Sequence, residues 1–266
     1  MTRFSDQVIW VTGASSGIGE ALVYAFARDG AHVVLSGRRE SELQRVASNC
    51  TDRTGQVFCV SFDMLDETGR KAAVEGVLSR FGHIDMLVNN AGVSQRALGK
   101  DTALSVDRAI MELDYMSVIA LTKLVLPHML ERGSGYLVAT SSVAGKYGVP
   151  MRTAYSAAKH ALHGFFDALR AELAGDNIKI SLLVIAGVQS QVSVNALTGD
   201  GSTWGKMDRV QSRGLTAEDC AQIVLDGLAK GEPEINVGRG AAMKALWLKR
   251  FFPKRLHKMM TKARTT

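Results

Sequence analysis

Short apolar runs alternate along most of the chain with longer amphipathic stretches. The runs are rich in Val, Ile and Leu and carry few polar residues, which predicts strands buried on both faces. The stretches between them have the spacing of helices with one apolar face. The predicted strands cover residues 7–12, 31–36, 57–61, 86–88, 136–140, 178–185 and 234–237, and the predicted helices cover 17–29, 39–49, 66–81, 101–131, 153–174 and 217–229.

This alternation of strand and helix predicts an α/β fold, with one doubly wound parallel sheet of about seven strands and helices on both faces. A length of 266 residues fits a single domain of this kind. We expect this domain to span residues 1–240 and a tail to follow over 241–266. Residues 195–214 interrupt the alternation with a run rich in Gly and polar residues. This insertion is either a lid over a site or a solvated loop.

The positive charge of the chain is concentrated in the tail. The formal net charge is +6, but residues 244–264 contain eight Lys or Arg and no acid, so the rest of the chain carries −2. Overall basicity is therefore a weak basis for nucleic-acid binding, and we expect no nucleic-acid partner.

The tail interleaves its bases with large apolar side chains. This composition is typical of an interfacial helix on anionic lipid, which Pro253 would kink or split. A second reading is that the apolar face packs on a neighbouring subunit or closes a substrate pocket. The apolar residues are Leu246, Trp247, Leu248, Phe251, Phe252, Leu256, Met259 and Met260.

Cysteine usage and hydropathy point to a cytoplasmic location. Cys50, Cys59 and Cys220 lie far apart, which argues against a disulfide framework and against a zinc site, so we expect no metal. The apolar stretch at the N-terminus is too short for a signal peptide. No segment has the roughly 18 consecutive apolar residues of a membrane span. We expect a cytoplasmic protein, with peripheral contact at a membrane through the tail as an open alternative.

A glycine-rich loop, T-G-A-S-S-G-I-G, joins the first predicted strand to the first predicted helix over residues 12–19. Glycines let the backbone turn tightly and approach a phosphate, and the N-terminus of the helix offers free N–H groups to a pyrophosphate. The position between strand and helix distinguishes this loop from an ordinary turn. The candidate cofactor-binding residues here are Gly13, Ser15, Ser16, Gly17, Ile18 and Gly19.

Tyr155 and Lys159 lie four residues apart at the start of a predicted helix, so they share one helix face. Free tyrosine has a pKa of about 10, and a nearby ammonium lowers it toward the range useful for a general acid/base. Ser142 lies thirteen residues before Tyr155, just beyond a predicted strand, where its hydroxyl can hold a substrate oxygen. The adjacent Ser141 offers a second hydroxyl at the same place.

These motifs occur together in one order: the glycine loop, N-N-A-G at residues 89–92, then Ser142, Tyr155 and Lys159. In this respect the chain resembles the short-chain dehydrogenases/reductases over about residues 5–238. The resemblance implies a Rossmann-like fold and an oxidoreductase that passes hydride between nicotinamide and a carbonyl or alcohol. It also implies that Tyr155 exchanges the proton and that Lys159 contacts the nicotinamide ribose. The family's spacing before the tyrosine favours Ser142 over Ser141 as the serine of the set.

Residues after the second and third strands concern the choice of cofactor. No acid follows the second strand to bind the adenosine ribose, and Arg38 and Arg39 stand there instead, which favours the 2′-phosphate of NADP(H). Arg38 is the expected main contact, with Arg39 or Ser15 assisting. Asp63 resembles the family's adenine-contacting acid. Asn89, Ala91 and Gly92 are further cofactor candidates, and Asn89 suits scaffolding equally well.

The chain departs from the family pattern at two positions. Asp114 stands where many members carry an Asn that holds a water of the proton relay, so the relay is either tuned or impaired. The segment 186–191 lacks the family's Pro and the usual Thr, although Val188 remains a candidate beside the nicotinamide.

Two functions fit these features. The first is an active NADP(H)-dependent oxidoreductase with Ser142, Tyr155, Lys159 and Asp114 as its catalytic candidates. The second is a nucleotide-binding regulatory or scaffold protein of the same fold, which the departures favour. By resemblance we expect a homodimer or homotetramer formed through 113–131 and 153–174. Apolar pocket walls favour a hydrophobic small-molecule substrate, and the predicted wall residues are Val93, Val143, Tyr147, Val149, Met151 and Trp204.

Overall fold

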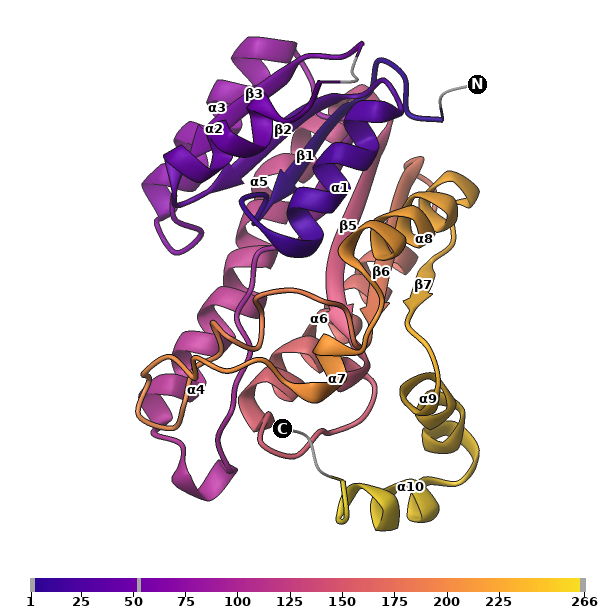
Figure 1. The fold of residues 1–266 in the computed structure, drawn as a ribbon. Helices are drawn as coiled ribbons and strands as arrows, with labels where there is room; N and C mark the ends of the chain where they lie inside the picture. The colour runs from indigo at the N-terminus through magenta and orange to yellow at the C-terminus, as the bar shows by residue number, and fades with distance from the viewer. Residues whose placement is uncertain (1–2, 52–53, 264–266) are drawn as a thin grey trace.

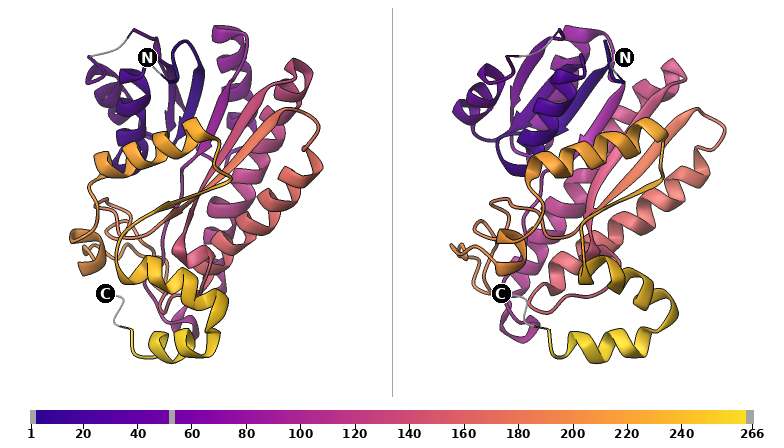
Figure 2. Two further views of the ribbon diagram at one scale, coloured as in Figure 1. Left: turned by 90° about the vertical axis from the view of Figure 1, so that its right-hand side faces the viewer. Right: turned by 45° about the vertical axis from the view of Figure 1, so that its right-hand side comes forward.

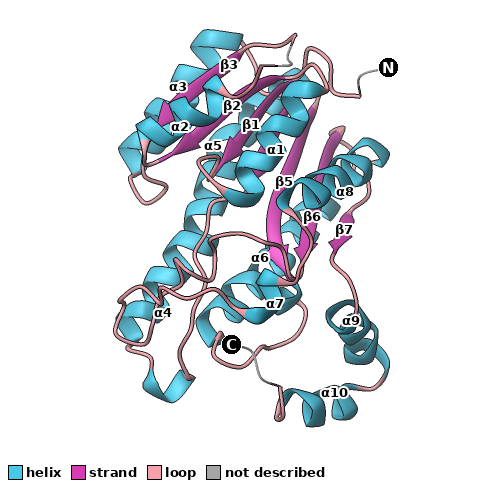
Figure 3. Ribbon diagram, viewed as in Figure 1, coloured by secondary structure: helices cyan, strands magenta, loops and turns pink. Residues whose placement is uncertain are grey.

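The computed structural model describes residues 3–51 and 54–263. Within these ranges seven parallel strands form one sheet in the order β3-β2-β1-β4-β5-β6-β7. The chain changes direction across the sheet between β1 and β4, where open α/β sheets form their ligand crevice. The strands, drawn in Figure 3, are β1 (Val8–Thr12), β2 (His32–Gly37), β3 (Val57–Ser61), β4 (Met86–Asn89), β5 (Gly135–Ser142), β6 (Ile178–Ile185) and β7 (Glu234–Val237).

Helices cover both faces of the sheet, which explains why the strands read as continuous apolar runs. All five residues of β1 are buried, because alternate side chains enter two separate cores. The first core lies against α1 (Gly17–Arg28), α2 (Glu40–Ser48) and α8 (Ala217–Lys230), and the second lies against α3 (Glu67–Phe81), α5 (Ser117–Arg132) and α6 (Thr153–Glu172). The predicted α/β class with a doubly wound parallel sheet is confirmed (Figure 1).

The helix predicted over 101–131 is not one continuous α-helix. A short 3-10 turn (Gly99–Asp101) precedes α4 (Leu104–Met111), and a π-helical turn (Glu112–Met116) joins α4 to α5. Such turns contain one extra residue and occur often at functional sites. The turn places Asp114 in the interior, where it is fully buried.

Strand β5 is longer than predicted and ends at Ser142 rather than at residue 140. Its last residues still pair with β6, because Ser141 and Ser142 lie opposite Val184 and Ile185. A 3-10 turn (Val143–Gly145) follows at once. Ser142 is therefore held by sheet hydrogen bonding and not by a free loop.

The segment 188–214 packs against the loop after β4 and includes the short helix α7 (Arg209–Ser212). The N–H of Leu197 donates to the carbonyl of Ser94 (2.9 Å), and the N–H of Arg96 donates to the carbonyl of Leu197 (2.8 Å). The N–H of Ala103 donates to the carbonyl of Gly199 (2.8 Å). This anchoring excludes a freely solvated loop.

The tail forms two helices, α9 (Ala241–Phe251) and α10 (Pro253–Met260). Pro253 is the first residue of α10, so it splits the tail as expected. Ala245 and Leu256 are buried against Tyr147 of the domain. Figures 1 and 2 show both helices beyond the carboxyl end of β7. In the described part of the chain, no helix is both long and apolar enough to cross a bilayer.

Candidate active site

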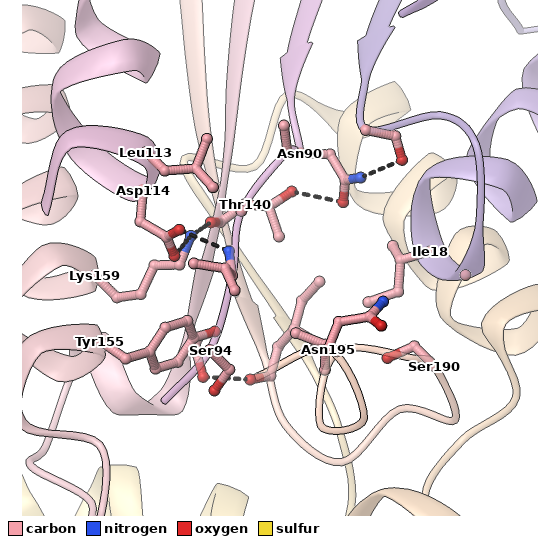
Figure 4. A pocket seen from close by; sticks show the side chains of 18 of the residues that line it. Ile18, Asn90, Ser94, Leu113, Asp114, Thr140, Tyr155, Lys159, Ser190 and Asn195 are labelled. Atoms are coloured by element: carbon pink, nitrogen blue, oxygen red, sulfur yellow. Dashed lines mark hydrogen bonds and ion pairs between the residues drawn. The ribbon is translucent and has the colours of Figure 1, made fainter. Parts of the chain in front are cut away.

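One large cavity, of about 960 Å³, opens at the carboxyl ends of the central strands. The loops after β1, β2, β4, β5 and β6 all contribute to its walls, and so does the tail. Figure 4 shows Tyr155, Lys159 and Asp114 on one side of the cavity and Ile18, Ser190 and Asn195 on the other. Its size and position fit a nucleotide together with a small substrate.

The glycine loop has a shape that only glycine permits at two points. Gly13 and Gly17 have φ of +65° and +58°, in the left-handed region. A Cβ on Gly19 would lie 2.2 Å from the carbonyl oxygen of Gly13, so helix α1 can approach the loop only without a side chain there. Gly19 itself does not line the cavity, whereas the other five candidates of the loop do: Gly13, Ser15, Ser16, Gly17 and Ile18.

Arg45 of α2 supports this loop and was missed from the sequence. Its guanidinium donates to the carbonyl of Ser15 (3.2 Å) and pairs with Glu20 of α1 (2.8 Å). Arg45 belongs to the charged outer face of α2, and nothing in the local sequence indicates that it contacts the glycine loop. Arg38 and Arg39 are exposed at the end of β2 and line the cavity, as does Asp63, whose carboxylate accepts from the N–H of Leu65 (2.9 Å).

The N-N-A-G run ties three strands together. The hydroxyl oxygen of Thr12 accepts from the N–H groups of Asn90 (3.0 Å) and Ala91 (3.1 Å). The Asn90 amide donates to the carbonyl of Thr12 (3.1 Å), and its oxygen accepts from the Thr140 hydroxyl (3.4 Å). Ala91 and Gly92 line the cavity, and Asn90, which the sequence reading omitted, lines it too.

Asn89 does not reach the cavity. It is 2% exposed, and its amide donates to the hydroxyl of Thr122 on α5 (3.2 Å). Of the two roles predicted for Asn89, the structure supports scaffolding. The physical reason is that successive strand residues point to opposite sides, so Asn89 faces the helix layer while Asn90 faces the ligand crevice.

Ser142, Tyr155 and Lys159 line the same cavity. The Lys159 ammonium lies 5.6 Å from the centre of the Tyr155 ring and donates to the carbonyl of Thr140 (3.0 Å). The Ser142 hydroxyl donates to the carbonyl of Ile185 (3.1 Å) and accepts from the N–H of Ala144 (3.2 Å). The sequence spacing of Ser142, Tyr155 and Lys159 thus brings their three polar side chains to one cavity.

Asp114 pairs directly with Lys159, at 3.2 Å between carboxylate and ammonium. Its other oxygen accepts from the N–H of Val93 (2.7 Å). Burial raises the pKa of the Asp114 carboxyl, although Lys159 and the Val93 N–H oppose the rise. Burial by itself lowers the pKa of Lys159, but the charge of Asp114, with Tyr155, outweighs it and the net shift is upward. The two groups form a buried ion pair at the back of the site.

A buried histidine lies behind this pair. The His163 imidazole Nε2 is 2.9 Å from the Ser141 hydroxyl, which is itself 3.4 Å from the carbonyl oxygen of Lys159. Burial lowers the pKa of His163 to about 4. The neutral imidazole, one turn after Lys159 on α6, therefore contacts Ser141 at the end of β5, and Ser141 has a structural role distinct from that of Ser142.

A cluster of buried charges that also lines the cavity was missed from the sequence. The carboxylate of Asp208, from the 188–214 segment, accepts from Arg96 (2.7 Å) and from Arg152 (2.8 Å). Burial, followed by the charge of Arg96, lowers the pKa of Arg152 to about 10. Arg96 and Asp208 are 112 positions apart in the sequence, and no local pattern indicates that they meet.

The predicted pocket walls are partly correct. Val93, Val143, Tyr147 and Val149 line the cavity. Met151 and Trp204 do not, because Met151 adopts φ of +62° in the turn before α6, and Thr203 rather than Trp204 faces the cavity. The segment after β6 contributes Val188, Ser190 and Gln191 to the walls, and the tail contributes Ala242, Met260 and Ala263. No group of side chains with the makings of a metal site occurs among the described residues.

Comparison with known proteins agrees with this geometry. A family model described as short chain dehydrogenase matches residues 7–200. The chain is 41% identical over 256 residues to a dehydrogenase/reductase SDR family protein 7-like of Anopheles gambiae, covering 94% of this chain and 81% of that one. The chain therefore belongs to the short-chain dehydrogenase/reductase family of oxidoreductases.

Solved structures show the same fold. A short-chain dehydrogenase/reductase from Burkholderia phymatum, in complex with NAD, has a TM-score of 0.83 at 24% identity and covers 100% of this chain and 98% of its own. A metagenomic short-chain oxidoreductase in complex with NADP has a TM-score of 0.73 at 27% identity, covering 88% of this chain and 98% of its own.

The ion pair between Asp114 and Lys159 is expected to contribute measurably to stability. A double-mutant cycle with Asp114→Asn and Lys159→Met should give a coupling of about 1–3 kcal/mol in the free energy of unfolding, because the pair is buried and each single change leaves its partner unbalanced. Urea unfolding measures this. The exposed pair Glu67–Lys71 is the control and should show no measurable coupling. Equal coupling in the two pairs would contradict the assignment.

The buried His163 should make stability depend on pH. The unfolded chain binds a proton at His163 below a pKa of about 6.5, whereas the folded chain binds it only near 4, so stability falls as the pH drops between these values. Between pH 8 and pH 5 this loss is about 2 kcal/mol. His163→Gln should reduce the loss by that amount in urea unfolding, while the exposed His257→Gln should leave it unchanged.

Proposed function

We propose that the protein is an NADP(H)-dependent oxidoreductase that reduces a carbonyl group, or oxidises a secondary alcohol, on a hydrophobic small molecule. The observation that carries the proposal is the convergence of Ser142, Tyr155 and Lys159 on one cavity that also contains the glycine loop. Each of the three residues has a distinct chemical task.

The cavity fits a dinucleotide at its glycine-loop end. Gly19 leaves no room for a Cβ beside the Gly13 carbonyl, so the loop and the N-terminus of α1 stay close together. The α1 N-cap residue, Ser16, makes no side-chain bond to the helix, which leaves the first N–H groups available to phosphate. A bound nicotinamide dinucleotide would supply or accept the hydride at the substrate carbon.

The protein's own residues would handle the proton and the oxygen. The Ser142 hydroxyl would turn from the Ile185 carbonyl to hold the substrate oxygen. Tyr155 would donate its phenolic proton to that oxygen during reduction and take it back during oxidation. Lys159 would stabilise the resulting phenolate, because an ammonium near the ring favours the charged form.

Asp114 would act as a positioning residue for Lys159. Its carboxylate fixes the ammonium from behind while the Thr140 carbonyl fixes it from one side. An Asn at this position would keep the contact with the Val93 N–H but would leave the charge of Lys159 unbalanced. The site would therefore hold Lys159 as half of a neutral pair, which is the main chemical difference from the family pattern.

NADP(H) is preferred over NAD(H) in this proposal because of charge at the end of β2. Arg38 and Arg39 line the cavity there, and neither makes an ion pair with any other described residue. Two exposed guanidinium groups at the adenosine end suit a 2′-phosphate. Ser15, Asp63, Ala91, Gly92 and Val188 complete the expected contacts.

The expected partners follow from the family. We propose a homodimer or homotetramer through α5 and α6, and a cytoplasmic location. The substrate would be apolar, since Val93, Val143 and Val149 form walls beside Tyr155. A non-catalytic nucleotide-binding role is the second candidate, favoured by Asp114 and by the altered 186–191 segment.

Replacing Tyr155 with Phe should lower turnover by about 10²–10⁴-fold, because the proton donor is lost while the ring remains. The measurement is NADPH oxidation against a panel of hydrophobic aldehydes and ketones, with NADPH affinity measured separately. Tyr136→Phe is a matched control, since its hydroxyl contacts Ser181 away from the cavity. Unchanged turnover in Tyr155→Phe would refute the mechanism, and tight NADPH binding with no turnover in any assay would favour the second candidate.

Replacing Arg38 with Ala should weaken NADPH binding by about 10-fold or more and leave NADH binding nearly unchanged, because one charge-assisted contact to the 2′-phosphate is lost. Titration of cofactor fluorescence measures both affinities. Arg108→Ala removes the same charge from an exposed position outside the cavity and should change neither affinity. An equal loss for NADPH and NADH would show that Arg38 does not read the phosphate.

A further inference from the structure

The tail presents two different faces. On the inner face, Ala245 of α9 and Leu256 of α10 are buried against Tyr147, with Val143 and Val149 packed beside them. This contact attaches the tail to the domain beside the cavity. It leaves the larger aromatic side chains of the tail without a partner in the domain.

Those aromatic side chains form an exposed patch, which we define as Trp247, Phe251 and Phe252. They are 57%, 58% and 49% exposed. The Trp247 ring centre lies 5.1 Å from that of Phe251 and 5.4 Å from that of Phe252, so the three rings form one contiguous surface. Large apolar patches of this kind on a soluble domain mark sites of interaction.

Positive charge surrounds the patch. Every Lys and Arg of the tail within the described range is exposed, and none forms an ion pair with another described residue. No acid occurs anywhere between residues 241 and 266. The exposed bases are Lys244, Lys249, Arg250, Lys254, Arg255, Lys258 and Lys262.

We propose that this face docks on the surface of a bilayer that contains anionic lipid. Aromatic rings enter the boundary between headgroups and acyl chains, and the surrounding bases contact the anionic headgroups. A second copy of the chain is the weaker occupant. A two-fold interface pairs a patch with itself, and here it would bring two strongly basic surfaces together without a single acid to balance them.

Docking would also bear on how a substrate enters. Ala242 and Met260 belong to the same two helices and line the cavity, so α9 and α10 are at once the docking element and a wall of the pocket. Figures 1 and 2 show both helices at the end of the molecule toward which the strands point. The proposed hydrophobic substrate would then reach the cavity from the membrane, a consequence that rests on the proposed function, whereas docking itself does not.

The test is co-sedimentation of the full chain with vesicles of phosphatidylcholine alone or with about 30% phosphatidylserine, at low and high salt. We expect binding to the anionic vesicles, about fivefold weaker for each base removed by Lys249→Gln or Arg250→Gln. The triple variant Trp247→Ser, Phe251→Ser, Phe252→Ser should bind at least 10-fold more weakly. The control variant Leu98→Ser, Leu104→Ser removes exposed apolar residues elsewhere and should bind like the wild type.

Tryptophan emission gives a second readout. Trp247 is the most exposed of the three tryptophans, so anionic vesicles should shift the emission to shorter wavelength, and Trp247→Phe should abolish that shift. Absence of vesicle binding at low salt, or equal binding by the triple variant and the wild type, would overturn the proposal. Binding to single-stranded oligonucleotide instead of vesicles would also overturn it. The same holds if the wild type is a dimer, the triple variant is a monomer, and neither protein binds lipid. None of these measurements requires turnover, so they are independent of the catalytic proposal.

Discussion

The buried ammonium of Lys159 imposes the strictest constraint on this molecule. A buried charge without a partner costs several kcal/mol, so the fold has to bring polar groups to it. The Thr140 carbonyl at 3.0 Å and the Asp114 carboxylate at 3.2 Å come from β5 and from the π-helical turn, and Lys159 itself comes from α6. Three elements are thereby fixed relative to one another, and Tyr155, one helix turn before Lys159, takes its place from the same constraint.

An acid in place of the usual amide changes the electrostatics of the site. The pair of Asp114 and Lys159 has little net charge, so the field at Tyr155 depends on the distances within the pair more than on the presence of the ammonium alone. His163 stays neutral behind the pair and adds no charge to this balance. The second buried cluster, around Asp208, serves another part of the cavity by joining the 188–214 segment to the domain.

Features that depend on residues close together in the sequence could be predicted, and features that depend on distant residues could not. The strands were readable because helices on both faces demand continuous apolar runs. Ser142, Tyr155 and Lys159 were identified through the spacing of the resembled family, and a strand end and a helix start carry them. Contacts between segments that lie far apart in the sequence could not be predicted in this way. The contact between Arg96 and Asp208 depends on the path of a long loop, which no periodicity encodes.

Small geometric differences produced the remaining errors. The sequence could not decide the role of Asn89, because neighbouring residues at the end of β4 point in opposite directions. The side chain of Asn89 contacts the helix layer, and that of Asn90 faces the ligand crevice. Met151 lies in a turn with φ of +62°, and Trp204 follows Thr203, which lines the cavity in its place. For Met151 and Trp204 the neighbouring residues line the cavity as predicted, while these two side chains do not.

The π-helical turn between α4 and α5 also separates two packing environments. Helix α5 packs on the sheet, while α4 packs on the start of α6 beside the cavity. The extra residue in the turn lets the two helices keep independent faces although they follow each other directly in the chain. Substitutions on α4, in the 188–214 segment or in the tail would therefore change the wall of the cavity while leaving the packing of α5 on the sheet intact.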